Sequence, residues 1–138
     1  MIHLRILRSI CKVSFLLDTH TLLWFLFNSP ELSKKALEKI QSNENVYVSI
    51  ISLWEIEIKK SIKKLDIDYS CSELVGLCGK ENIDLLQVLP KHIDKIKDLP
   101  FIHRDPFDRL LIAQAQSENL TIITKDLIIP KYDVKTIW

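Results

Sequence analysis

PFDRLLIAQAQSENLTIITKD, residues 106–126, joins a helix to a strand and decides the fold class. Residues 106–118 are predicted to form an amphipathic helix, with Pro106 at the first helical position. TIIT, residues 121–124, is a short β-branched run of the kind that forms a buried strand. A helix that leads directly into a buried strand is typical of an α/β fold.

The rest of the chain repeats this alternation of helices and strands. Further strands are predicted at residues 13–17, 46–50, 84–89 and 134–138, the last as an edge strand. Further helices are predicted at residues 19–27, 33–42, 52–64, 72–79 and 92–99. The order predicts an α/β fold with a central, mainly parallel sheet that is flanked by helices on both faces.

Composition limits the classes of function. The 138 residues fit one domain, and the net charge of +1 neither requires nor excludes a nucleic-acid partner. The chain has only two glycines, which excludes a phosphate-binding P-loop and a GxGxxG dinucleotide turn. Three cysteines form no CxxC pair, which favours a reducing compartment, and the four histidines lack the spacing of a zinc site.

Three aspartates fall where ligand sites form in α/β proteins. Asp18 directly follows the buried run FLL, and Asp126 follows TIIT by one residue, so both lie at the carboxyl ends of predicted strands. Asp108 lies in the first turn of the helix at 106–118, behind Asp105. Each also has a simpler structural interpretation, since Asp18 and Asp105 suit helix caps, Asp126 suits a turn, and Asp108 complements a helix dipole.

Glu55 is the fourth acid of interest. At helical spacing, an apolar stripe is predicted on the helix at 52–64 and just before it, and Glu55 lies inside its border. The stripe consists of Ile51, Trp54, Ile58 and Ile62. A carboxylate in that position needs a partner, and a salt bridge and a metal ion fit this requirement equally well.

Four carboxylates that converge on one crevice would repel one another unless a cation lay between them. Carboxylate oxygens suit the hard ions Mg²⁺ and Mn²⁺, which can activate a water for attack on a phosphodiester. Metal-dependent nuclease chemistry therefore follows if the four acids converge.

Several longer motifs strengthen this hypothesis. In chain order they are FLLDTHTLLWFL, VYVSIISLWEIEIKK, LPFIHRDPFDRLLIAQAQ, LTIITKD and YDVKTIW. With these motifs the chain resembles the PIN-domain ribonucleases, specifically the VapC-type toxins of type II toxin–antitoxin pairs, from about residue 15 to the C-terminus. The resemblance implies a PIN fold, an RNA substrate, a separately encoded antitoxin and a homodimer.

The resemblance also assigns roles to residues. It implies that the catalytic residues and the ligands of Mg²⁺ or Mn²⁺ are Asp18, Glu55, Asp108 and Asp126. Supporting roles around them are expected for Thr19, Asp105, Thr124 and Arg109. Two lysine clusters are candidates for RNA contacts: Lys59, Lys60, Lys63 and Lys64, or Lys91, Lys95 and Lys97.

Residues 1–14 precede the point at which the family usually begins, so the PIN domain is expected at residues 15–138. This extension carries Arg5, Arg8 and Lys12, and it is expected to be a disordered tail, an added strand or a basic RNA contact. It only weakly resembles a signal peptide, because Lys12 interrupts its apolar run and no cleavage site follows, so a cytoplasmic protein is expected.

Alternatives to a ribonuclease stay open at this stage. One is a structure-specific DNA nuclease of the same fold, and another is a non-catalytic module that binds RNA or a protein. A phosphatase with Asp18 as nucleophile is disfavoured, because His20 stands where such enzymes carry a second aspartate. The RNA target and the number of metal ions are not encoded in any motif.

Overall fold

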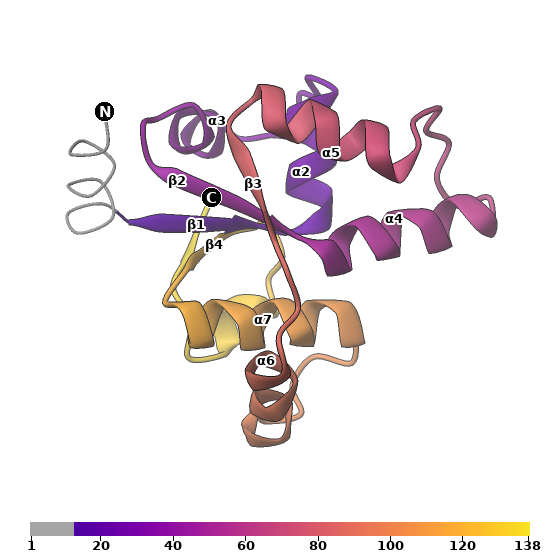
Figure 1. Ribbon diagram of the computed structural model, residues 1–138. Coiled ribbons are helices and arrows are strands. Elements are labelled where there is room, and N and C mark those ends of the chain that lie inside the picture. The colour runs from indigo at the N-terminus through magenta and orange to yellow at the C-terminus, as the bar shows by residue number, and fades with distance from the viewer. Residues whose placement is uncertain (1–12) are drawn as a thin grey trace.

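Five parallel strands form one sheet in the order β3-β2-β1-β4-β5 (Figure 1). The structure is a computed structural model and describes residues 13–138, so most of the predicted extension at residues 1–14 lies outside the described residues. The strands are β1 (Ser14–Leu17), β2 (Asn45–Ser49), β3 (Ile83–Leu86), β4 (Thr121–Ile123) and β5 (Thr136–Ile137). The predicted parallel sheet is confirmed, with β5 at its edge.

Helices cover both faces of the sheet, as predicted. They are α2 (Thr19–Leu26), α3 (Lys34–Ile40), α4 (Ile50–Ser61), α5 (Cys71–Lys80), α6 (Pro90–Lys95) and α7 (Pro106–Glu118), with short 3₁₀ helices η1 (Ile96–Asp98) and η2 (Ile129–Lys131). In Figure 1, α3 and α5 lie above the sheet and α6 and α7 lie below it. The helix expected at residues 92–99 is divided between α6 and η1.

Alternating side chains of the strands divide the interior into two cores. Phe15 and Leu17 of β1 pack with α2, α3, α4 and α5, whereas Leu16 between them packs with α7 and η2. This alternation is the period of two that an extended strand imposes. Because both faces of β1 are covered, the run SFLL is apolar almost throughout.

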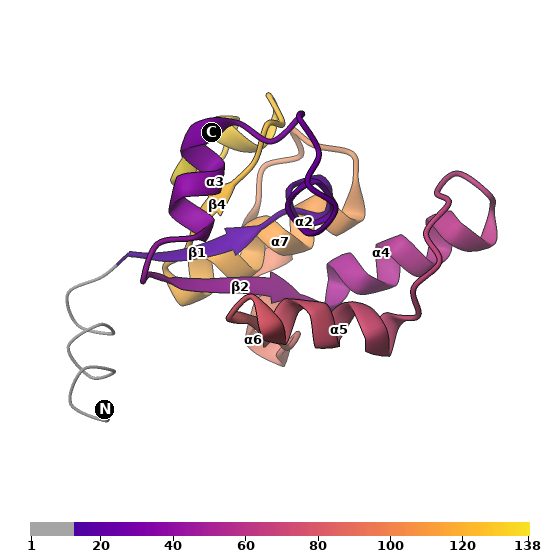
Figure 2. The same ribbon diagram turned by 90° about the horizontal axis from the view of Figure 1, so that it is seen from above.

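The order in which strands are added to the sheet reverses between β1 and β4, although all strands stay parallel. Strands β1, β2 and β3 follow one another toward one edge, and β4 then returns to the other side of β1. Figure 2 shows β1 and β2 running the same way, toward the edge at which α2 and α4 begin. Crevices at the carboxyl ends of strands beside such a reversal are the usual ligand sites of open α/β sheets.

The buried face of α4 differs from the predicted one. Trp54 and Ile62 of the predicted stripe are 58% and 54% exposed, whereas Leu53 and Ile56 are fully buried. The inward face instead includes the polar residues Ser52 and Glu55, beside Leu53 and Ile56. Glu55 is therefore buried, as expected, but on a face different from the one that predicted it.

Among the described residues, no helix has the length and apolar character needed to cross a membrane.

Candidate metal-binding site

A cleft of about 430 Å³ opens beside the carboxyl ends of β1 and β4. It is lined by Asp18, Thr19, His20, Trp24, Glu55, Lys59, His103, Asp105, Asp108, Lys125 and Asp126. All four acids predicted from the sequence line this one cleft, although they come from four separate parts of the chain. The convergence on which the nuclease hypothesis depended is therefore present.

Asp18 links the two strands that flank the cleft. It is buried and caps α2, because its Oδ1 accepts a hydrogen bond from the main-chain N–H of Thr21 at 2.9 Å. Its Oδ2 accepts a hydrogen bond from the hydroxyl of Thr124, which follows β4. The predicted cap is confirmed, and Thr124, for which a supporting role was expected, contacts one of the cleft acids.

Asp126 is fixed by the turn that follows β4. Its Oδ1 accepts hydrogen bonds from the main-chain N–H groups of Ile128 at 2.7 Å and Ile129 at 2.9 Å. Its own N–H donates to the hydroxyl of Thr124 at 3.0 Å. One carboxylate oxygen thus holds the turn, and the other, Oδ2, lies toward the cleft.

Glu55 enters the cleft from α4 and has partners at both oxygens. The hydroxyl of Thr19 donates to Oε1 at 2.6 Å, and the ammonium of Lys59 lies 2.9 Å from Oε2. With only 5% of the residue exposed, these partners offset part of the cost of burying the charge. The salt bridge considered for Glu55 is present, and it places Lys59 in the cleft.

Asp105 and Asp108 stand at the start of α7. Asp105 is the N-cap, as predicted, and its Oδ1 accepts from the main-chain N–H groups of Phe107 at 2.8 Å and Asp108 at 3.3 Å. Burial, and then repulsion by the other acids of the cleft, raises the pKa of the Asp108 carboxyl from 3.8 to about 8. The repelling charges belong to Asp105, Asp18, Glu55 and Asp126.

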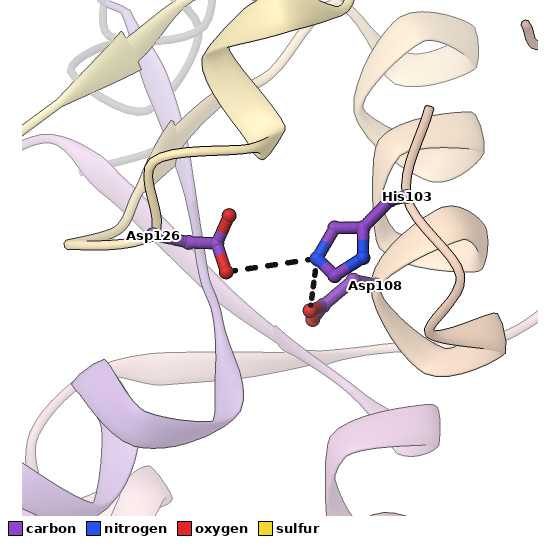
Figure 3. Close-up of side chains that lie close together, drawn as sticks. All are labelled: His103, Asp108 and Asp126. Atoms are coloured by element: carbon purple, nitrogen blue, oxygen red, sulfur yellow. Dashed lines mark ion pairs between the residues drawn. The ribbon is translucent and has the colours of Figure 1, made fainter. Parts of the chain in front are cut away.

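His103 is a cleft residue that the analysis of the sequence missed. Its Nε2 lies 2.9 Å from Oδ2 of Asp108 and 3.6 Å from Oδ2 of Asp126 (Figure 3). This nitrogen is buried and forms no aligned hydrogen bond with either carboxylate. The sequence spacing of histidines did not reveal it, and its only sequence signal was its place beside DPFD.

Arg109 lies on the outer side of this segment. Its guanidinium donates to the carbonyl of Pro100 at 3.0 Å and to the hydroxyl of Tyr132 at 3.2 Å. The hydroxyl of Tyr132 also accepts a hydrogen bond from the main-chain N–H of His103, so Arg109 is linked to the cleft through Tyr132.

Of the lysines predicted to contact RNA, only Lys59 lines the cleft. Lys60 instead pairs with Glu57, and Lys91 pairs with Glu118, both at 2.9 Å. Lys125, which the two predicted clusters did not include, also lines the cleft.

The residues of the cleft fit a divalent cation. The ligand-type atoms of His103, Asp108 and Asp126 lie within 4.8 Å of one another. The pKa of Asp108 is raised first by burial and then by repulsion from the other acids, and a cation would remove this repulsion. Oδ2 of Asp126 accepts no hydrogen bond from the described residues. Carboxylate oxygens in this number suit Mg²⁺ and Mn²⁺.

The fold and the cleft define an open, parallel α/β protein with an acidic cleft at the switch point of its sheet. The chain belongs to the PIN domain family, whose sequence model matches residues 15–135. The match covers most of the chain and confirms the predicted PIN fold.

Solved structures with the same fold come from bacterial VapBC and FitAB proteins. VapBC2 from Rickettsia felis, bound to a DNA fragment from its promoter, matches with a TM-score of 0.69 and 15% identity, over 91% of this chain and 98% of that chain. DNA-bound VapBC from Salmonella typhimurium matches with a TM-score of 0.62 and 16% identity, over 91% and 97%. FitAcB from Neisseria gonorrhoeae matches with a TM-score of 0.60 and 17% identity, over 90% and 96%. No curated protein sequence matches the chain.

Proposed function

We propose that the protein is a metal-dependent endoribonuclease that hydrolyses RNA phosphodiester bonds with Mg²⁺ or Mn²⁺. The observation that carries the proposal is the convergence of four acids on one cleft, with the pKa of Asp108 raised to about 8. The proposed catalytic residues and metal ligands are Asp18, Glu55, Asp108 and Asp126. The proposed catalytic domain is residues 15–138, preceded by the extension at 1–14.

The side chains have separate tasks in this proposal. A divalent ion bound by the acids supplies charge neutralisation and activation of a water. Asp18 and Asp126 have little freedom to move, because turn or cap N–H groups fix one oxygen of each. Thr19 fixes Glu55, and the ammonium of Lys59 offers a positive charge to an RNA phosphate at the mouth of the cleft.

We further infer that the enzyme is the toxin of a toxin–antitoxin pair and acts in the cytoplasm. The inference is supported by the fold similarity to VapBC and FitAB proteins over nearly the whole of both chains. A second groove, beside the cleft and lined in part by Trp24, Phe27 and Tyr69, offers apolar surface to an antitoxin helix. A homodimer is part of the same proposal, and light scattering on the purified chain would test it.

The nuclease proposal is tested by incubating the full chain with mixed RNAs in Mg²⁺, Mn²⁺ or EDTA. An Asp108→Ala variant and an Asp94→Ala variant, which changes an exposed acid away from the cleft, are purified in the same way. We expect cleavage that requires a metal, persists in Asp94→Ala and falls by about 10³-fold in Asp108→Ala.

Equal cleavage by Asp108→Ala, or cleavage in EDTA, would refute the proposal. Single-stranded and branched DNA of matching sequence are included in the same assay, because cleavage of DNA alone would make the protein a DNA nuclease. For the toxin, we expect growth arrest when the chain is expressed alone in bacteria, and normal growth with Asp108→Ala. Arrest by both chains would contradict a catalytic toxin.

A further inference from the structure

The imidazole of His103 is held in one position beside two of the cleft acids (Figure 3). The main-chain N–H of His103 donates to the hydroxyl of Tyr132 at 2.7 Å, and the residue is only 9% exposed. Its Nε2 is directed toward Asp108 and Asp126 without an aligned hydrogen bond to either. A buried ring nitrogen without a hydrogen-bond partner is destabilising, so this atom calls for an explanation.

Two roles are compatible with the distances alone. Nε2 could bind a metal ion together with the two carboxylates, or it could carry a proton and donate it to them in hydrogen bonds. The first role needs a free lone pair on Nε2, and the second needs an N–H there. The position of the ring proton therefore decides between them.

The other ring nitrogen fixes the position of this proton. The main-chain N–H of Asp105 donates to Nδ1 of His103 at 3.3 Å. Because an accepting Nδ1 has a free lone pair, the proton of the ring lies on Nε2. Moving it to Nδ1 would set two N–H groups against each other, whereas metal-binding histidines present the N–H of their second nitrogen to an acceptor.

We propose that His103 is a positioning residue that donates its Nε2–H to the carboxylate of Asp108, beside the carboxylate of Asp126, and that His103 is not itself a ligand of the metal ion. The inference rests on the proposed function and deepens it. An N–H between two like-charged carboxylates lowers their repulsion and fixes the orientation of each. Oδ1 of Asp126 is already held by the turn, so rotation of the Asp108 carboxylate is what aligns the hydrogen bond.

This role has a consequence for the choice of metal. Without a nitrogen ligand, the cleft offers only hard oxygen donors, which favour Mg²⁺ and Mn²⁺ over Zn²⁺. The atoms of His103, Asp108 and Asp126 are thus spaced closely enough to bind a metal together. The proton on Nε2, however, leaves only the carboxylate oxygens of this group free to bind it.

The proton position is measured directly by ¹⁵N NMR of the full chain, with and without Mg²⁺. We expect His103 to show a protonated Nε2 and an unprotonated Nδ1 in both conditions. A proton that moves to Nδ1 on addition of Mg²⁺ would overturn the proposal. This measurement needs no variant, so it does not depend on whether a substituted chain folds.

Mn²⁺ binding tests the positioning role with two variants. His103→Gln retains a side-chain N–H near the position of Nε2, whereas His103→Leu has similar size and no donor. We expect His103→Leu to weaken Mn²⁺ binding by about tenfold and His103→Gln to restore most of the loss. Asp94→Ala is the control, because Asp94 is exposed and lies outside the cleft.

Electron paramagnetic resonance of the Mn²⁺ complex shows whether a nitrogen atom is bonded to the metal ion. We expect no coupling from a directly bonded nitrogen, and a coupling that disappears in His103→Gln would make His103 a ligand and overturn the proposal. Unchanged Mn²⁺ affinity in both folded His103 variants would also overturn it while leaving the proposed nuclease intact. Absence of Mn²⁺ and Mg²⁺ binding by the unaltered chain would instead refute the proposed function, and the positioning role with it.

Discussion

The cleft contains two kinds of acid, those at strand ends and those on helices, and they are held in different ways. Asp18 and Asp126 follow β1 and β4, and main-chain N–H groups of the next few residues bind one oxygen of each. Glu55 and Asp108 project from α4 and α7 and face Lys59 and His103 instead. The strand-end acids therefore stabilise the fold and also line the cleft. The helix acids receive no such main-chain hydrogen bonds from the described residues, and their buried charge lowers the stability of the folded protein.

The largest expected effect on stability is the loss of Asp18. In Asp18→Ala the N–H of Thr21 and the hydroxyl of Thr124 lose their acceptor inside the protein. We expect the free energy of unfolding to fall by about 3 kcal/mol, from the lost cap and the unpaired donors. Urea unfolding beside the exposed Asp94→Ala control measures it, and a loss no larger than that of the control would show that Asp18 does not support the fold.

Asp108→Asn, measured in EDTA, should raise the free energy of unfolding instead of lowering it. The folded protein holds the proton of Asp108 up to a pKa of about 8, whereas the unfolded chain releases it near 3.8, so the unaltered protein loses stability as the pH rises between these values. Asparagine does not ionise, so we expect the variant to be the more stable by at least about 2 kcal/mol near pH 9 and by little near pH 3.8. Urea unfolding across this range measures the difference, and a difference that does not change with pH would contradict the raised pKa.

A bound cation should remove the repulsion among the acids and so stabilise the folded protein. We expect Mn²⁺ to raise the melting temperature of the unaltered chain, by the equivalent of about 1.4 kcal/mol for each tenfold excess over its dissociation constant. Asp108→Asn should show a smaller rise, since it lacks one ligand. Scanning calorimetry with Mn²⁺ and with EDTA measures both, and equal rises in the two proteins would place the ion elsewhere.

The smallest effect is expected for Glu55→Gln. Glutamine can still accept the hydrogen bond from the hydroxyl of Thr19, and it loses only a pair with the partly exposed Lys59. We expect the free energy of unfolding to change by less than about 1 kcal/mol while RNA cleavage falls strongly. A loss of stability as large as that of Asp18→Ala would remove the distinction between strand-end and helix acids.

The same division explains how much of the site could be predicted from the sequence. Asp18 and Asp126 were found because a buried strand ends beside them, and Asp105 because a proline follows it, which are local signals. The alternation of strands and helices likewise predicted the parallel sheet, because each element has its own period of apolar residues.

The partners of the helix acids were not predicted in this way. Lys59 was assigned to a lysine cluster for RNA, although its place four residues after Glu55 on one helix is the spacing that indicates an ion pair. The inward face of α4 contains serine and glutamate, so its apolar pattern indicated Trp54 instead. His103 depends on the meeting of the segment before α7 with the turn after β4, a contact between distant parts of the chain that no spacing records.

Anomalous diffraction from crystals grown with Mn²⁺ would show whether the acids of the cleft hold a divalent cation. We expect an anomalous peak within about 2.0–2.4 Å of carboxylate oxygens of the four proposed ligands, Asp18, Glu55, Asp108 and Asp126, with His103 outside bonding distance. A Mn²⁺ peak away from these carboxylates, or a cleft without one at a saturating concentration, would contradict this expectation.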